Sequence, residues 1–211
     1  LSKKNDKSFS AGAFAESELE KGLLYYGTDR GSFWVTKNDG KNWNENSDNI
    51  ANAYIRSISP SRFKKSRVYM SMTGINYDDL NNYIYYSENY GEKWVSIRNN
   101  LPNEPVNIIV EDYKYENILY AGLHRGLYIS FDRGSSWSLF GKNIPQSSIS
   151  DIEVNVEYND MIVSTHGRGI YKLNLNAVHT FYNIQNQENN FSDYLIESNE
   201  MFLPEYNDTH K

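Results

Sequence analysis

The stretch Thr36-Lys-Asn-Asp-Gly-Lys-Asn-Trp43 decides the fold, because the chain repeats it twice. Ser87-Glu-Asn-Tyr-Gly-Glu-Lys-Trp94 and Ser130-Phe-Asp-Arg-Gly-Ser-Ser-Trp137 follow the same pattern: Ser or Thr, any residue, Asp or Asn, any residue, Gly, two residues, Trp. The tryptophans stand 51 and 43 residues apart. One copy of so short a pattern means little, but three copies at this spacing indicate an internal repeat.

Each position of the pattern suits a tight turn between two strands. Gly supplies the positive φ that such a turn needs, and Asp or Asn can accept hydrogen bonds from its own turn. The Trp then begins the next strand, and we expect all three tryptophans to be buried. The residues with these structural roles are Thr36, Asn38, Gly40 and Trp43; Ser87, Asn89, Gly91 and Trp94; and Ser130, Asp132, Gly134 and Trp137.

A second repeated element precedes each turn. Short apolar strands align without gaps at Leu24–Asp29, Val68–Thr73, Leu119–His124 and Met161–His166. Each has a small residue before the following turn: Gly27, Ser71, Gly122 or Ser164. Another strand-like run lies upstream of each, at Phe9–Phe14, Tyr54–Ser59, Val106–Glu111 and Ile149–Val156. Four antiparallel strands every 42 to 51 residues are typical of a β-propeller blade.

The sequence therefore predicts an all-β fold for residues 1–175, with about four four-stranded antiparallel blades at 8–48, 49–103, 104–146 and 147–175. The fourth unit lacks a repeat turn, and the Asn- and Gln-rich residues 176–211 lose the period. We expect an irregular exit segment there, with at best a weak strand at 174–178. Closed propellers have about four to eight blades. We expect an open arc of a larger propeller, with its remaining blades as a partner.

Composition and charge exclude several classes of function. The 211 residues have a formal net charge of −6 and scattered Lys and Arg, which argues against nucleic-acid binding. No apolar run approaches the roughly 20 residues that a membrane span needs. There is no cysteine for a disulfide or a thiolate metal site. Aromatic residues make up 15%, and the 18 tyrosines suit strands as well as surfaces that bind peptides or sugars.

The alternating direction of the strands assigns the turns to two faces. The repeat turns join third and fourth strands and share one face with the loops between first and second strands. The turns between second and third strands lie on the opposite face, where charged and aromatic residues converging near the axis would form a binding site. The candidate binding residues on that face are Arg30, Tyr77, His124, Arg125, His166 and Arg168.

Several of these residues have a structural alternative. His124 and His166 occupy equivalent repeat positions, which favours a shared structural role over metal binding, and two histidines without a fixed carboxylate are a weak metal signal. Asp78 and Asp79 either cap a long hairpin or act in catalysis, and Arg168 pairs either with a neighbouring blade or with a ligand. We expect no metal and no cofactor.

The repeat turns resemble the Asp boxes of the bacterial neuraminidase repeat (BNR) superfamily, which includes sialidases, xyloglucanase-type glycoside hydrolases and sortilin receptors. Residues 14–173 are similar to the C-terminal part of the propeller of bacterial exported proteins labelled sortilin-like or glycosyl hydrolases. The segments that carry this resemblance are LLYYGTDRGSFWVTKNDGKNW, YDDLNNYIYYSENYGEKW, LYAGLHRGLYISFDRGSSW and MIVSTHGRGIYKL. The chain departs from the pattern at Asn38 and Asn89, where an Asp box has Asp.

The resemblance implies an exported binding module, extracellular, periplasmic or on the cell surface, that recognises a protein, peptide or glycan on the face opposite the Asp boxes. One alternative is a fragment of a sialidase- or xyloglucanase-like glycoside hydrolase with its active site partly outside this segment. Such an enzyme needs two carboxyl groups, and the candidates are Asp29, in a Thr-Asp-x-Gly turn like that of xyloglucanase-type enzymes, Asp78 and Asp79. A second alternative is a structural propeller of a surface assembly.

Overall fold

The computed structural model describes residues 10–141 and 143–187. Its strands form four antiparallel sheets of consecutive strands, here called blades 1 to 4; three have four strands, and the last has three among the described residues. Their bounds are β1 (Ala11–Glu16), β2 (Leu24–Thr28), β3 (Phe33–Thr36) and β4 (Asn44–Glu45); β5 (Tyr54–Pro60), β6 (Val68–Gly74), β7 (Asp79–Ser87) and β8 (Val95–Ser96); β9 (Val106–Glu111), β10 (Leu119–Leu123), β11 (Gly126–Ser130) and β12 (Ser138–Phe140); and β13 (Ile149–Asn155), β14 (Asp160–Thr165) and β15 (Gly169–Asn174).

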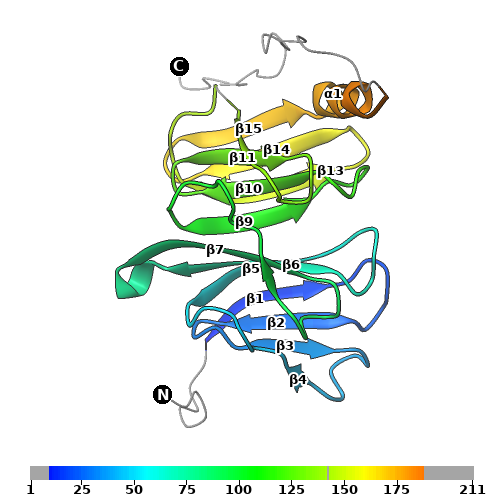
Figure 1. The fold of residues 1–211 in the computed structure, drawn as a ribbon, viewed down its shortest axis with the longest axis vertical. Helices are drawn as coiled ribbons and strands as arrows, with labels where there is room; N and C mark the ends of the chain where they lie inside the picture. Colours follow the sequence, from blue (N-terminus) through cyan, green and yellow to red (C-terminus); the bar gives the residue numbers. More distant parts are fainter. Residues whose placement is uncertain (1–9, 142, 188–211) are drawn as a thin grey trace, which may run out of the picture.

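The blades are stacked in chain order, with blades 1 and 4 at opposite ends of the molecule (Figure 1). The first strand of each blade packs against the first strand of the next, β1 against β5, β5 against β9 and β9 against β13. Among the described residues, no extensive contact joins blade 1 to blade 4. The predicted all-β fold is confirmed, and the described part of the chain forms an open arc rather than a closed ring of four blades.

Apolar clusters fill the three spaces between neighbouring blades. Each cluster contains a fully buried tyrosine from the same position of the second strand, Tyr25, Tyr69 or Tyr120. Because side chains alternate along a strand, the neighbours of these tyrosines on the second strand point toward the preceding blade. Each inner blade therefore packs on both sides, and this two-sided packing explains why every residue of β6 and β10 is buried.

The three repeat turns share one hydrogen-bond pattern. Ser87 Oγ accepts the backbone N–H of Asn89 (3.2 Å) and of Gly91 (2.9 Å) and donates to Asn89 Oδ1 (2.9 Å), which also accepts the N–H of Lys93 (2.9 Å). The same four contacts recur in the turns that begin at Thr36 and Ser130. In every turn the Gly and the residue before it both have φ between 55° and 88°. The turns are therefore structural units.

The tryptophan at the end of each repeat turn packs on the preceding blade. Trp94 Nε1 donates to the carbonyl of Asn46 (3.1 Å), and Trp137 Nε1 donates to the carbonyl of Ile97 (2.8 Å). These two side chains are 9% and 4% exposed. Trp43 is partly exposed, because no described blade precedes blade 1. The expectation that all three tryptophans are buried is wrong for Trp43.

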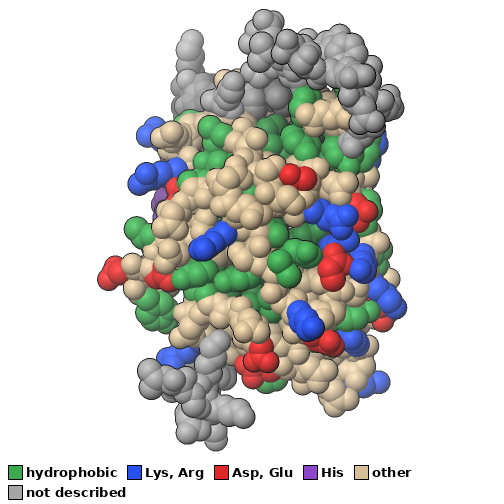
Figure 2. Space-filling view, viewed as in Figure 1, with side chains coloured by type: hydrophobic (Ala, Val, Ile, Leu, Met, Phe, Trp, Pro, Cys, Tyr) green, Lys and Arg blue, Asp and Glu red, His purple; other side chains and the backbone are tan. Residues whose placement is uncertain are grey.

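The face of the repeat turns also holds a buried polar cluster between blades 2 and 3. The buried guanidinium of Arg67 lies 2.7 Å from Glu88, 2.9 Å from Glu116 and 3.6 Å from Glu111. Glu111 in turn accepts hydrogen bonds from Ser61 and Tyr69. These contacts join blade 2 to blade 3. On the side of the molecule that Figure 2 shows, basic and acidic side chains are intermixed, with no large patch of one sign.

Helix α1 (Asn176–Gln187) follows blade 4, where an irregular segment and a weak strand were expected. His179 Nε2 lies 3.0 Å from Asp112 Oδ2 of blade 3, and Tyr115 donates to Asn183 (2.8 Å). Short helices depend on tertiary packing. The contacts with blade 3 therefore stabilise a helix that the Asn- and Gln-rich sequence did not predict. The prediction is wrong for residues 176–187; residues 188–211 lie outside the described residues. No helix in the described ranges is long and apolar enough to cross a membrane.

Candidate functional site

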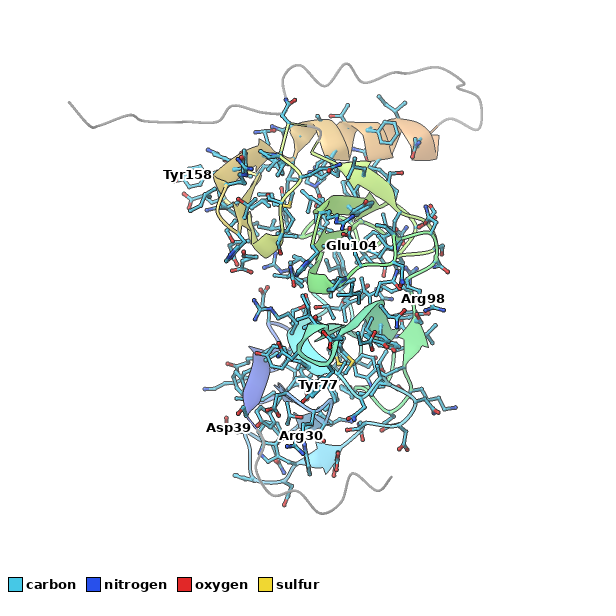
Figure 3. The ribbon with its side chains drawn as sticks, turned by 90° about the vertical axis from the view of Figure 1, so that its left-hand side faces the viewer. Arg30, Asp39, Tyr77, Arg98, Glu104 and Tyr158 are labelled. Atoms are coloured by element: carbon cyan, nitrogen blue, oxygen red, sulfur yellow. The ribbon has the colours of Figure 1, made fainter. Side chains whose placement is uncertain are left out.

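The face opposite the repeat turns carries the four turns between second and third strands, together with the blade-to-blade connections. Figure 3 looks onto this face, with Arg30 and Tyr77 on the turns of blades 1 and 2 and Glu104 on the connection between blades 2 and 3. The 3₁₀ helix η2 (Ile75–Tyr77) makes the turn of blade 2 the largest of the four. The four turns differ in length and composition, unlike the repeat turns.

A pocket of about 360 Å³ opens where the inner strands of blades 2, 3 and 4 approach these turns. We call it the axial pocket, because strands β5, β9 and β13 are the innermost strands of their blades. Pockets of a few hundred Å³ are the usual size for small ligands. Its lining residues are Tyr54, Arg56, Thr73, Ile75, Asn76, Asn107, His124, Ser148, Ser150 and His166.

The backbone holds the two histidines of the pocket in equivalent places. The N–H of His124 donates to the carbonyl of Pro105 (3.1 Å), and the N–H of His166 donates to the carbonyl of Ser148 (2.8 Å). Asp29 makes the same contact in blade 1, from its N–H to the carbonyl of Ser10 (3.1 Å). The role that these three positions share is therefore a hydrogen bond of the backbone N–H. Their side chains differ between blades, and both imidazoles line the pocket.

The pocket combines positive charge with hydrogen-bonding groups. Arg56 is exposed, and it has no ion-pair partner among the described residues. Asn107 Nδ2 donates to Ser148 Oγ (2.9 Å) and to the carbonyl of Ile149 (2.8 Å), which fixes the orientation of its amide. The lining contains no carboxylate. A guanidinium that forms no ion pair within the described part of the chain, beside fixed amide and hydroxyl groups, suits an anionic ligand that also carries hydroxyl groups.

The other predicted binding residues are not part of the pocket lining. Tyr77 is 64% exposed at the end of η2. Arg125 is exposed and its Nε lies 3.9 Å from Glu104 Oε2. The contact of Arg168 uses its backbone, whose carbonyl accepts a hydrogen bond from Tyr171 (2.9 Å). Arg30 likewise lies on the turn of blade 1 outside the pocket.

The three aspartates considered for catalysis do not line the pocket. Asp29 Oδ1 accepts the N–H of Ser10 (3.3 Å). Asp78 ends η2 with a φ of 57°. Asp79 accepts hydrogen bonds from Tyr83 (2.7 Å) and Asn81, and these bonds hold its pKa below the usual value. The contacts of Asp78 and Asp79 support the hairpin-cap interpretation.

Sequence reasoning missed Arg56, Asn107 and Ser150, and it also missed Glu104. Burial raises the pKa of Glu104 above its usual value, and Arg125 offsets this only in part. Glu104 lies on this face but outside the axial pocket. No group of three or more potential metal ligands occurs among the described residues.

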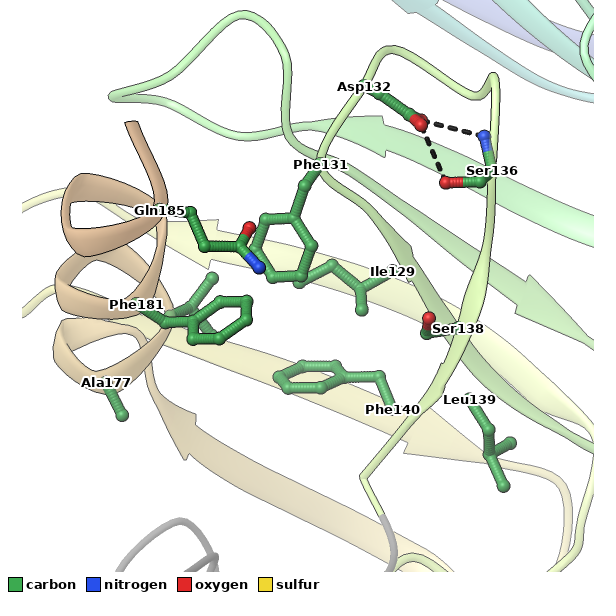
Figure 4. Close-up of a pocket in the computed structure, with 11 residues that line it drawn as sticks. Ile129, Phe131, Asp132, Ser136, Ser138, Leu139, Phe140, Ala177, Phe181 and Gln185 are labelled. Atoms are coloured by element: carbon green, nitrogen blue, oxygen red, sulfur yellow. Dashed lines mark hydrogen bonds between the residues drawn. The ribbon is translucent and has the colours of Figure 1, made fainter. Parts of the chain in front are cut away.

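A second, more apolar pocket of about 560 Å³ lies between α1 and the outer strands of blade 3 (Figure 4). Phe131, Phe140 and Phe181 line it, and the hydrogen bonds of Asp132 to Ser136 close one side. In blade 2, the carbonyl of Ile97 accepts the indole N–H of Trp137. Phe140 is the equivalent residue of blade 3. The pocket therefore lies where a repeat-turn tryptophan of blade 4 would pack, and α1 covers part of that space.

Comparisons with solved structures agree with the architecture. The GH74 xyloglucanase from Xanthomonas campestris matches with a TM-score of 0.58 and 14% identity, over 78% of this chain and 29% of that one. The Niastella koreensis GH74 enzyme matches with a TM-score of 0.61 and 16% identity, over 80% and 29%. YCF48 from Cyanidioschyzon merolae matches with a TM-score of 0.54 and 15% identity, over 78% and 52%.

The chain is similar in fold to β-propellers. At this identity the likeness shows the fold alone, and the chain spans less than a third of the length of the GH74 structures. No protein-family model and no curated protein matches the sequence. The function must therefore be argued from the site itself.

Proposed function

We propose that this chain is a binding module whose axial pocket holds an acidic glycan, a sugar chain that carries carboxylate groups. The observation that carries this proposal is the exposed Arg56, which has no ion-pair partner within residues 10–141 and 143–187, in a pocket lined also by His124 and His166 and by no carboxylate. Guanidinium groups bind carboxylates through paired, charge-assisted hydrogen bonds. Tyr54, Asn107 and Ser150 add the aromatic ring, amide and hydroxyl groups that sugar hydroxyls recognise.

Binding of an acidic glycan is compatible with an extracellular, periplasmic or cell-surface location for this protein. That location remains a prediction. An acidic peptide shares the carboxylate but not the hydroxyl groups. Comparing the two kinds of probe therefore distinguishes glycan from peptide recognition.

The test is calorimetric titration of the chain with a hexuronic-acid oligosaccharide, with a neutral oligosaccharide of the same length and with an acidic peptide. We expect only the acidic sugar to bind well. Arg56→Gln should weaken it about tenfold or more, because a charge-assisted hydrogen bond is lost. The matched control is Lys93→Gln, which removes an exposed cation from a repeat turn on the other face. Equal binding of the neutral sugar, or equal losses in both variants, would refute the proposal.

The alternative of a glycoside hydrolase fragment rests on the fold shared with the GH74 enzymes. It predicts turnover of a β-glucan or sialoside that Asp29→Asn abolishes. Two carboxyl groups must flank the scissile bond, about 5 to 9.5 Å apart, and Asp29, Asp78 and Asp79 all lie outside the axial pocket. We therefore expect no turnover of either substrate by this chain.

A further inference from the structure

The two ends of the arc present different surfaces. In each sheet, cross-strand rows of side chains point alternately toward the preceding blade and toward the following blade. We call these sides the incoming face and the outgoing face. On the incoming face of blade 1, Tyr26 of β2 lies between Phe14 of β1 and Trp34 of β3.

The equivalent rows are covered in the other three blades. They consist of Ile58, Met70 and Tyr85 in blade 2; Ile109, Ala121 and Tyr128 in blade 3; and Ile152, Val163 and Tyr171 in blade 4. The first residues of these rows are 9%, 0% and 3% exposed, whereas Phe14 is 63% exposed. Tyr26 is also partly exposed, whereas its equivalents Met70, Ala121 and Val163 are fully buried; the third residue of the row is partly exposed in all four blades. Blade 1 therefore carries an apolar row of the kind that elsewhere packs on a neighbouring blade.

The repeat turn of blade 1 shows the same difference. A Cβ at Gly91 or Gly134 would lie 2.4 Å from Phe33 or 2.9 Å from Ile97, both in the preceding blade. At Gly40, the atoms within 4 Å of such a Cβ belong to Trp43 of its own turn. Trp94 and Trp137 each donate to a carbonyl that directly follows the fourth strand of the preceding blade. Blade 1 thus has the apolar row, the repeat turn and the tryptophan of a blade-to-blade contact, but no blade precedes it among residues 10–141 and 143–187.

The outgoing face of blade 4 does not supply that missing side. The row that holds Ala15, Tyr25 and Val35 in blade 1 holds Glu153, Ile162 and Lys172 in blade 4. Glu153 and Lys172 are exposed, and Lys172 pairs with Asp160 (2.8 Å). Burying these charges against Phe14 and Tyr26 would be costly. A second copy of this chain that stacks its blade 4 on blade 1 is therefore a poor occupant.

We propose that the incoming face of blade 1 docks a further propeller blade of the same repeat type. The partner blade presents an aromatic and aliphatic outgoing row like that of Ala15, Tyr25 and Val35, together with a carbonyl after its fourth strand that accepts the indole N–H of Trp43. The docking extends the arc at blade 1 only. It does not depend on which ligand the axial pocket binds.

The test uses the chain with a second copy of residues 10–53 placed directly ahead of residue 10, so that the natural connection 46–53 leads into β1. We expect exchange of the Trp43 indole N–H to slow about tenfold or more, because docking buries it in a hydrogen bond. In the control, the added copy carries Ala15→Glu, Tyr25→Ile and Val35→Lys, which reproduces the outgoing row of blade 4. This copy should give no protection.

Two further measurements keep the outcome clear. If the added copy of residues 10–53 does not protect the Trp43 indole N–H, an added copy of residues 54–103, blade 2, shows whether the choice of added blade is the cause. No protection by either added blade would overturn the proposal. Sedimentation of the unextended chain tests the rival occupant. A dimer at micromolar concentration that Tyr26→Asp abolishes, with no protection of Trp43 in the extended chains, would assign the face to a second copy instead.

Discussion

The two faces of the arc are built in opposite ways. The face of the repeat turns uses one set of hydrogen bonds three times, at Thr36, Ser87 and Ser130. The opposite face has four different turns, three of which share a backbone anchor, the N–H groups of Asp29, His124 and His166. The repeated turns therefore provide the contacts that fold the blades, and the turns that differ between blades lie on the side that can recognise a ligand.

The largest effect is expected on the face of the repeat turns, at two of its tryptophans. Trp137→Ala should lower the free energy of unfolding by about 3–5 kcal/mol, because it leaves a cavity between blades 2 and 3. Trp43→Ala should cost only about 1–2 kcal/mol, since this side chain is partly exposed and loses less buried surface. Denaturant unfolding measures both values, and equal losses would show that Trp43 is as well packed as Trp137.

The second effect concerns the docking of α1 on blade 3 and depends on pH. Burial opposes ionisation of Asp112, but hydrogen bonds from His179, the N–H of Lys114 and Tyr120 outweigh it and hold the pKa below the usual value. A depressed carboxyl pKa stabilises the fold above the unfolded pKa of about 3.9 and loses that contribution as pH falls through the folded value. The melting temperature should therefore fall more steeply below about pH 4 in the parent than in Asp112→Asn. Parallel curves would contradict this assignment.

The smallest effects compare single side chains on the two faces. Ser87→Ala removes the acceptor of two backbone N–H groups in a repeat turn and should cost about 1–2 kcal/mol of unfolding free energy. His124→Ala, whose structural contact is made by its backbone, should change stability by less than about 0.5 kcal/mol. Thermal unfolding of both variants measures the difference. A larger loss for His124→Ala would place folding contacts on the variable face.

The sequence predicted the repeat because each turn carries its own local chemistry, from Ser87 to Gly91 to Trp94. It did not predict the exposure of Trp43, because burial depends on a neighbouring blade rather than on the turn. Helix α1 was missed for a similar reason: its docking through His179 involves Asp112, 67 residues earlier.

The site was predictable only in part. Strand parity predicted that His124 and His166 share a face, and both line the axial pocket. Arg56 and Asn107 looked like ordinary polar residues of half-exposed strands. Only the convergence of β5, β9 and β13 brings them together, and that convergence is a property of the packed blades.

The central claim is that recognition takes place in the axial pocket, and chemical-shift mapping by NMR tests it most directly. The chain would be titrated with the hexuronic-acid oligosaccharide while backbone and side-chain amides are followed. We predict the largest shifts at the side-chain amide of Asn107 and the backbone amides of His124 and Ser150. Shifts that instead centre on the repeat turns, at Gly91 and Gly134, would contradict the account.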